Sequence, residues 1–146
     1  LSRSATTQAL AYWGLAVATE RDGDLPTSLE LARRASSFRF GPPNHLVVAL
    51  DLPSVYFTPP YEEHYYRALA TMAEAARAAV SDERRMLLQT ASLLWSLYLD
   101  GAQRDSERWV ANAKAHRDAC RRELSRLDAE RDRAVGAGSE PRRDED

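Results

Sequence analysis

The sequence predicts an all-α fold of about five helices, arranged as antiparallel hairpins that stack into a short solenoid. Apolar residues recur every three or four positions in successive segments, as expected for helices that bury one face. Turn residues such as Asp22-Gly23-Asp24 separate the first two segments by a few positions only, and helices joined by so short a turn lie antiparallel. With 146 residues, 44% hydrophobic and 29% charged, the chain is long enough for one domain with its own core.

The first predicted hairpin has one helix over residues 5–22 and a second that begins near Pro26. The first helix is apolar on most sides and carries no charge before Glu20, so we expect it to be buried. Pro26 suits the first turn of the second helix. The core residues expected from this hairpin are Leu10, Tyr12, Trp13, Leu15, Ala16, Val17, Leu29, Leu31, Ala32 and Ala35.

Residues 42–58 form the least regular part of the predicted fold. The run from Leu46 to Leu52 fits either a short buried helix, which we favour, or an extended segment, because periodicity does not separate the two at this length. Val55 to Phe57 is expected to be extended, since a following proline disfavours the helical region. The sequence leaves open whether this segment fills a groove between the helices.

The third helix is predicted from Thr58 to Arg77. Thr58 can act as the N-cap, Pro59 suits the first helical position, and Glu62 and Glu63 lie where the helix dipole favours negative charge. Its expected packing face comprises Tyr61, Tyr65, Leu69, Met72, Ala76 and Val80, and its opposite face comprises Glu63, Arg67, Glu74 and Arg77.

The fourth helix is predicted to begin with a cap at Ser81-Asp82-Glu83 and to stop at Gly101. It is apolar around most of its circumference, so we expect it to be sandwiched between other helices. The last helix, from Asp105 or Ser106, carries one narrow stripe of Trp109, Ala113, His116, Cys120, Leu124 and Leu127, which is typical of an edge helix. We therefore predict one domain over residues 1–135 and a disordered charged tail over residues 136–146.

The first hairpin resembles a tetratricopeptide-type repeat. The residues that carry the resemblance are Tyr12, Leu15, Ala16, Gly23-Asp24, Ser28 and Ala35, whereas Thr19 and Ala32 stand where that family usually has aromatic residues. Residues 61–127 are similar to the alanine- and tryptophan-bearing hairpins of repeat proteins from GC-rich bacteria. The resemblance implies a non-enzymatic scaffold that presents a groove to a peptide or a partner protein.

Composition limits the classes of partner. A net charge of −2 and no basic patch argue against nucleic acid as the main ligand. Lys114 is the only lysine among many arginines, which is typical of a GC-rich, bacterial genome. Cys120 is the only cysteine, so no disulfide forms within the chain, and no run of about 20 apolar residues predicts a membrane span. We expect a cytoplasmic protein, and leave open what precedes Leu1.

Two residue groups are candidates for a catalytic or a metal site. Glu62-Glu63-His64 places carboxylates beside an imidazole, but adjacent residues on a helix point about 100° apart, so we favour helix-dipole acids followed by a boundary histidine. His116 and Cys120 share one helix face, yet a zinc site needs three or four ligands. The sequence therefore predicts no catalytic residue, no metal and no cofactor.

The favoured function is a protein-protein interaction adaptor that does not catalyse a reaction. Tyr66 lies at the rim of the third helix's packing face with Arg67 beside it, and both are expected to contact a partner. Leu124 and Leu127 are the candidate seam for another helix. Two alternatives stay open: a structural subunit that self-assembles through its last helix into a homo-oligomer, and an enzyme that uses His64 with Glu62 or Glu63.

Overall fold

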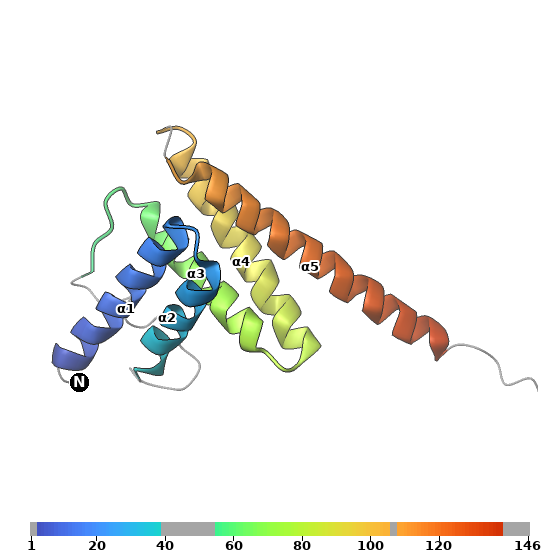
Figure 1. Cartoon of the computed structure of the whole chain (residues 1–146). Helices are drawn as coiled ribbons and strands as arrows, with labels where there is room; N and C mark the ends of the chain where they lie inside the picture. Colours follow the sequence, from blue (N-terminus) through green and yellow to red (C-terminus); the bar gives the residue numbers. More distant parts are fainter. Residues whose placement is uncertain (1–2, 39–54, 106–107, 139–146) are drawn as a thin grey trace, which may run out of the picture.

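The computed structural model describes residues 3–38, 55–105 and 108–138, and every regular element in these ranges is an α-helix (Figure 1). The helices are α1 (Arg3–Arg21), α2 (Leu25–Ser37), α3 (Glu62–Arg77), α4 (Ser81–Ala102) and α5 (Val110–Ala137). The predicted all-α fold class is therefore confirmed. The favoured helix over residues 46–52 and residues 139–146 of the predicted tail lie outside the described residues, whereas Gly136 and Ala137, also predicted in that tail, belong to α5.

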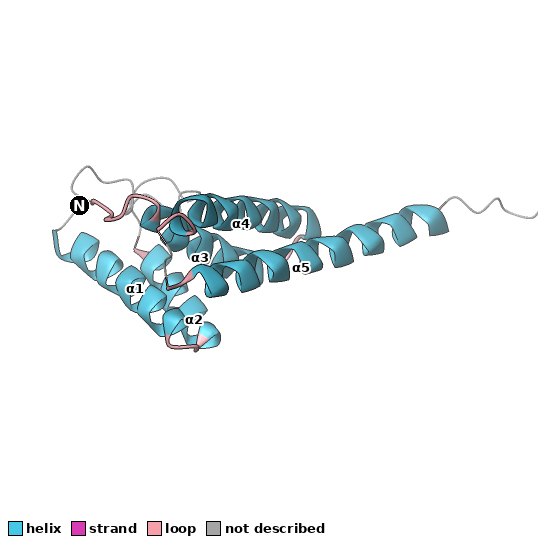
Figure 2. Ribbon diagram, turned by 90° about the horizontal axis from the view of Figure 1, so that it is seen from above, coloured by secondary structure: helices cyan, strands magenta, loops and turns pink. Residues whose placement is uncertain are grey.

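The helices pack mainly against their neighbours in the chain. The α1/α2 and α3/α4 hairpins each run antiparallel, α2 packs against α3, and α5 packs along α4 (Figure 1). The view from above places α4 along the edge of the molecule opposite α2 (Figure 2). This arrangement puts α1, α3 and the start of α5 close enough to share one buried cluster of side chains, which is described below. No helix in the described ranges combines the length and apolar character needed to cross a membrane.

The first hairpin closes as the sequence predicts. Asp24 is the N-cap of α2: its carboxylate accepts a hydrogen bond from the backbone N–H of Thr27 at 3.1 Å. Gly23 adopts a φ of 95°, which residues with a side chain rarely reach. Buried Ser28 donates to the carbonyl of Ala16 at 2.6 Å, so the small residue lets α2 approach α1 closely.

The start of α3 differs from the prediction. The helix begins at Glu62, and Tyr61, in the N-cap position, makes no side-chain capping bond. Thr58 and Pro59 lie in the preceding turn, because Pro60 disfavours a helical conformation at Pro59. At the other end the helix stops at Arg77. Ala76 and Val80 were both expected in the packing face. In the structure Ala76 is exposed, and Val80, which lies beyond the helix, is 61% exposed.

Helix α4 corrects three further expectations. Val80 occupies the N-cap position and no side chain caps the helix, contrary to the predicted cap at residues 81–83. Gly101 lies inside α4 rather than after it, and its lack of a Cβ makes room for the ring of Tyr61. The helix is not sandwiched on all sides, because α3 and α5 leave one apolar face uncovered, formed by Met86, Leu93 and Leu97.

Helix α5 follows the predicted stripe. Ala113, Cys120 and Leu127 are buried, whereas residues 128–138 are exposed and their part of the helix projects past α4 (Figure 1). The helix starts at Val110, a few positions later than expected, and continues to Ala137. It is therefore an edge helix over its first half and a solvated helix over its second.

The two glycines inside helices provide a matched test of packing. A Cβ at Gly101 would lie 2.5 to 2.7 Å from side-chain atoms of Tyr61, including its Cβ, which cannot swing away. Gly101→Ala should therefore destabilise the fold by about 1–3 kcal/mol. A Cβ at Gly14 meets nothing within 4 Å, so Gly14→Ala should stabilise the fold by about 0.5–1 kcal/mol through helix propensity. Urea unfolding measures both, and equal effects would contradict the close approach.

Candidate functional site

Glu20, in the last turn of α1, is the centre of a buried polar cluster. Its side chain sits in the core, where the residue is 3% exposed. The hydroxyl of Tyr65 on α3 donates to Oε2, and Asn112 Nδ2 on α5 donates to Oε1 at 3.1 Å. His116 Nε2, also on α5, lies 2.7 Å from Oε1. One carboxylate thus binds side chains from two other helices.

The hydrogen bonds to the Glu20 carboxylate set the direction in which its pKa is shifted. Burial alone would raise the pKa of Glu20. The hydrogen bonds from His116, Tyr65 and Asn112, with the attraction to His116 when protonated, outweigh burial and hold the pKa of Glu20 below its ordinary value. Burial and the Glu20 carboxylate in turn raise the pKa of Tyr65, so its phenol keeps its proton. The cluster is therefore a fixed carboxylate with bound donors.

Arg21, the next residue on α1, makes a second link to α3. Its Nη2 lies 2.9 Å from both carboxylate oxygens of Glu62, and both side chains are largely buried. The guanidinium also lies 4.4 Å above the ring of Tyr65 and 5.0 Å from that of Trp109. The end of α1 is thus joined to the start of α3 and to the residue before α5.

Aromatic rings surround the polar cluster. Tyr65 meets Trp95 and Tyr98 of α4 edge to face, with ring centroids 4.8 and 4.9 Å apart. The ring of Trp95 also lies 5.0 Å from that of His116. These contacts hold the rings of the cluster in one orientation, and they bring α4 into the same packed unit.

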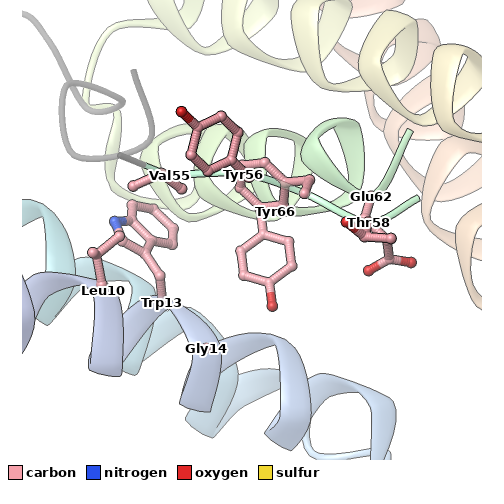
Figure 3. A pocket seen from close by; sticks show the side chains of 9 residues that line it. Leu10, Trp13, Gly14, Val55, Tyr56, Thr58, Glu62 and Tyr66 are labelled. Carbon is pink, nitrogen blue, oxygen red and sulfur yellow. The ribbon is translucent and has the colours of Figure 1, made fainter. Parts of the chain in front are cut away.

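Two hollows lie side by side on the face formed by α1, α3 and the start of α5. The first has a volume of about 330 Å³ and runs between α1 and residues 55–58; Figure 3 shows Trp13 facing Val55 and Tyr66 across it. Its lining residues are Leu10, Trp13, Gly14, Val55, Tyr56, Phe57, Thr58, Glu62 and Tyr66. The second, also about 330 Å³, is lined by Gly14, Val17, Ala18, Arg21, Asp22, Tyr66, Arg108 and Trp109. Gly14 and Tyr66 line both hollows, so the two adjoin.

The predicted contact residues lie in two separate places. Tyr66 is half-buried in the wall of both hollows, with its ring edge-on to Phe57 at 5.1 Å. Arg67 pairs with Glu63 one turn earlier, at 2.6 Å. Leu124 and Leu127 are on α5, outside these hollows, and Leu127 is 5% exposed because it packs into the core. Of the four, Tyr66 alone lines the hollows.

The structure also shows the partners of the candidate catalytic and metal-binding residues. Arg21 binds Glu62 and Arg67 binds Glu63, while the buried Nδ1 of His64 has no hydrogen-bond partner. In the ranges that the structure describes, no three metal-ligating side chains come together. His116 instead binds Glu20, and burial raises the pKa of the Cys120 thiol to about 11.

Sequence reasoning missed the roles of Glu20 and Asn112. The available signal was a lone charge at the end of the apolar run that forms α1, because a buried charge requires partners elsewhere in the fold. The identity of those partners is not encoded locally, since Asn112 lies 92 positions away.

Comparison with protein-family models finds no match, and neither the curated proteins nor the solved structures contain a significant match to this chain. The function must therefore be argued from the geometry of the chain itself.

The Glu20 cluster predicts a specific pH dependence. Because the folded-state pKa of Glu20 is lowered, its contribution to stability is present above its ordinary value near 4.5 and is lost as the pH falls through the folded-state pKa. Glu20→Gln should cost about 1–3 kcal/mol at pH 7. The difference from wild type should shrink by pH 3 in urea unfolding. A difference that stays constant from pH 7 to pH 3 would contradict this account.

Proposed function

We propose that this chain is a non-enzymatic, tetratricopeptide-like adaptor that binds an extended peptide across the face formed by α1, α3 and the start of α5. The observation that carries the proposal is the pair of adjoining hollows joined at Gly14 and Tyr66. The resemblance of the first hairpin to tetratricopeptide repeats supports the same role.

The lining of the hollows suggests which peptide would fit. Leu10, Trp13 and Phe57 give the first hollow an apolar part, which suits a bulky apolar side chain, beside the polar side chains of Thr58 and Glu62. The second hollow combines Trp109 with charged residues, so it suits a neighbouring polar side chain. Tyr66 stands between them, and an aromatic ring with a polar tip is a frequent anchor of binding energy. Alternate side chains of an extended peptide, at positions i and i+2, point to the same face and lie about 6.6 Å apart, so two adjoining hollows can each take one of them.

The walls of the hollows are held before any ligand arrives. The Arg21–Glu62 pair fixes the end of α1 against the start of α3, and the Glu20 cluster fixes both to α5. Val55 to Phe57 form a rim, and a hollow of about 330 Å³ remains beneath them. Binding to rigid walls costs less ordering of side chains and loops. This favours a recognition surface over a flexible catalytic loop.

A selection experiment with matched variants at Gly14 tests this proposal. The probe is a phage-displayed library of random 12-residue peptides selected on the full chain, and affinities are then measured by fluorescence polarisation. Selected peptides should be enriched in bulky apolar residues. Gly14→Leu places a side chain at the junction of the hollows and should weaken binding at least tenfold, whereas Gly14→Ala should leave it within about twofold.

Tyr66→Ala provides a second arm, because it removes the side chain that lines both hollows. It should also weaken binding at least tenfold while circular dichroism shows the helices intact. Failure to select any peptide, or selected peptides that bind Gly14→Leu and Tyr66→Ala like wild type, would overturn the proposal.

Self-assembly through α5 is the second proposal, because residues 128–138 are exposed on a helix that projects from the body (Figure 1). Light scattering over a hundredfold dilution compares the full chain with one that ends at Leu127. The adaptor proposal expects monomers throughout. A defined oligomer of the full chain that the shorter chain loses would favour assembly. The enzyme hypothesis rests on His64, whose carboxylate neighbours are bound by Arg21 and Arg67.

A further inference from the structure

Another hollow lies between the turn that joins α1 to α2 and the start of α5. Its volume is about 280 Å³, and its lining residues are Glu20, Gly23, Leu25, Ala111, Asn112, Ala115 and His116. None of these residues lines the two hollows of the proposed peptide site. The space remains open because α5 packs along α4 rather than along α1 or α2, and because a glycine and two alanines line it.

The polar part of this lining belongs to the Glu20 cluster. A carboxylate only accepts hydrogen bonds, so Asn112 turns its NH2 group, and His116 an N–H, towards Oε1 of Glu20. In the neutral imidazole the second ring nitrogen, Nδ1, is then an acceptor, and the amide oxygen of Asn112, Oδ1, is another. Asn112 and His116 converge on the same oxygen atom from one face of α5, so their two remaining acceptors belong to neighbouring groups.

Both acceptors are open to solvent. No described residue donates to Nδ1 of His116 or to Oδ1 of Asn112, and neither atom is among the buried polar atoms without a partner. The side chain of His116 is nevertheless only 13% exposed, and its ring lies against that of Trp95. Because both side chains line the hollow, the hollow is where a ligand can reach these fixed acceptors.

Two neighbouring acceptors favour a ligand atom that donates more than one hydrogen bond. A hydroxyl group donates one, whereas a primary ammonium group donates three. The rest of the lining includes Leu25, Ala111 and Ala115, which suit the CH2 groups of a small aliphatic molecule. Apolar walls with a few placed polar groups are typical of small-molecule sites.

The balance of charge also favours a cation. Among the described residues, acidic and basic side chains next to the lining residues balance: Asp22, Asp24 and Asp118 against Arg108, Lys114 and Arg117. Arg21 is bound to Glu62. The ends of α1, α2 and α5 near the hollow contribute partial charges of both signs, each about half an elementary charge. The full charge that remains is the carboxylate of Glu20, because its partners Tyr65, Asn112 and the neutral His116 ring carry none.

We propose that the hollow between the α1–α2 turn and α5 binds a small molecule that carries a primary amine. Its ammonium group donates to Nδ1 of His116 and Oδ1 of Asn112, and its apolar part lies against Leu25, Ala111 and Ala115. The site shares no lining residue with the peptide-binding hollows, so either proposal can hold without the other.

The experiment compares three probes of similar shape by NMR titration of the 15N-labelled full chain. Cyclohexylamine has the charge and the N–H donors, cyclohexanol has one donor and no charge, and N,N,N-trimethylcyclohexylammonium has the charge but no N–H donor. Cyclohexylamine should give saturable shifts of the side-chain amide of Asn112 and of the backbone amides of Ala111 and Ala115. The other two probes should bind at least tenfold more weakly.

Two matched variants of α5 locate the site. Ala115→Leu fills the hollow and should weaken the binding of cyclohexylamine at least tenfold, whereas Ala129→Leu makes the same change outside the hollow and should leave binding unchanged. Both alanines are exposed, so both variants should keep the helical circular dichroism of wild type. Gly14→Leu, at the junction of the peptide-binding hollows, should also leave amine binding unchanged.

Four results would overturn the proposal: no saturable shift with cyclohexylamine, equal affinities for the three probes, shifts that map to another surface, or an Ala115→Leu variant that binds like wild type. None of them would affect the peptide proposal, because that proposal is tested with different probes and with variants at Gly14 and Tyr66.

Discussion

The buried carboxylate of Glu20 is the constraint on which the rest of the structure depends. A carboxylate removed from water must be matched by donors, and an unmatched one costs several kcal/mol. The donors come from Tyr65 on α3 and from Asn112 and His116 on α5, which are 45, 92 and 96 positions away in the chain. Satisfying one side chain therefore fixes the positions of three helices relative to one another. Apolar packing alone specifies such a register less sharply, because it does not depend on direction.

The same constraint creates the surface that we propose as the peptide site. Arg21 follows Glu20 on α1, and while Glu20 turns into the core, Arg21 binds Glu62 and stacks on aromatic rings at the edge. The polar links hold α1 against α3 and the start of α5, and the two hollows lie along this contact. A binding wall built on rigid helices keeps its shape without the ligand, which lowers the entropy cost of binding.

The hollows that we propose as the peptide site and the exposed apolar residues of α4 lie on different helices. The hollows on α1 and α3 combine apolar, polar and charged lining residues and suit an extended peptide. Met86, Leu93 and Leu97 of α4 are exposed. Helix α3 packs against α4 and also contacts α1 and α2, so it separates these residues from the hollows.

The sequence by itself determined where most helices form, the turn at residues 22–24 and the buried stripe of α5, because spacing and turn residues act within a few positions. It predicted both Tyr66 and Leu127 as contact residues, whereas in the structure Tyr66 lines the hollows and Leu127 is buried in the core. Only the tertiary structure decided which apolar residues of α4 stay exposed, why Gly101 must be small, and which donors meet Glu20. Those outcomes depend on which helices lie beside each residue, and partners 92 positions apart leave no local pattern to read.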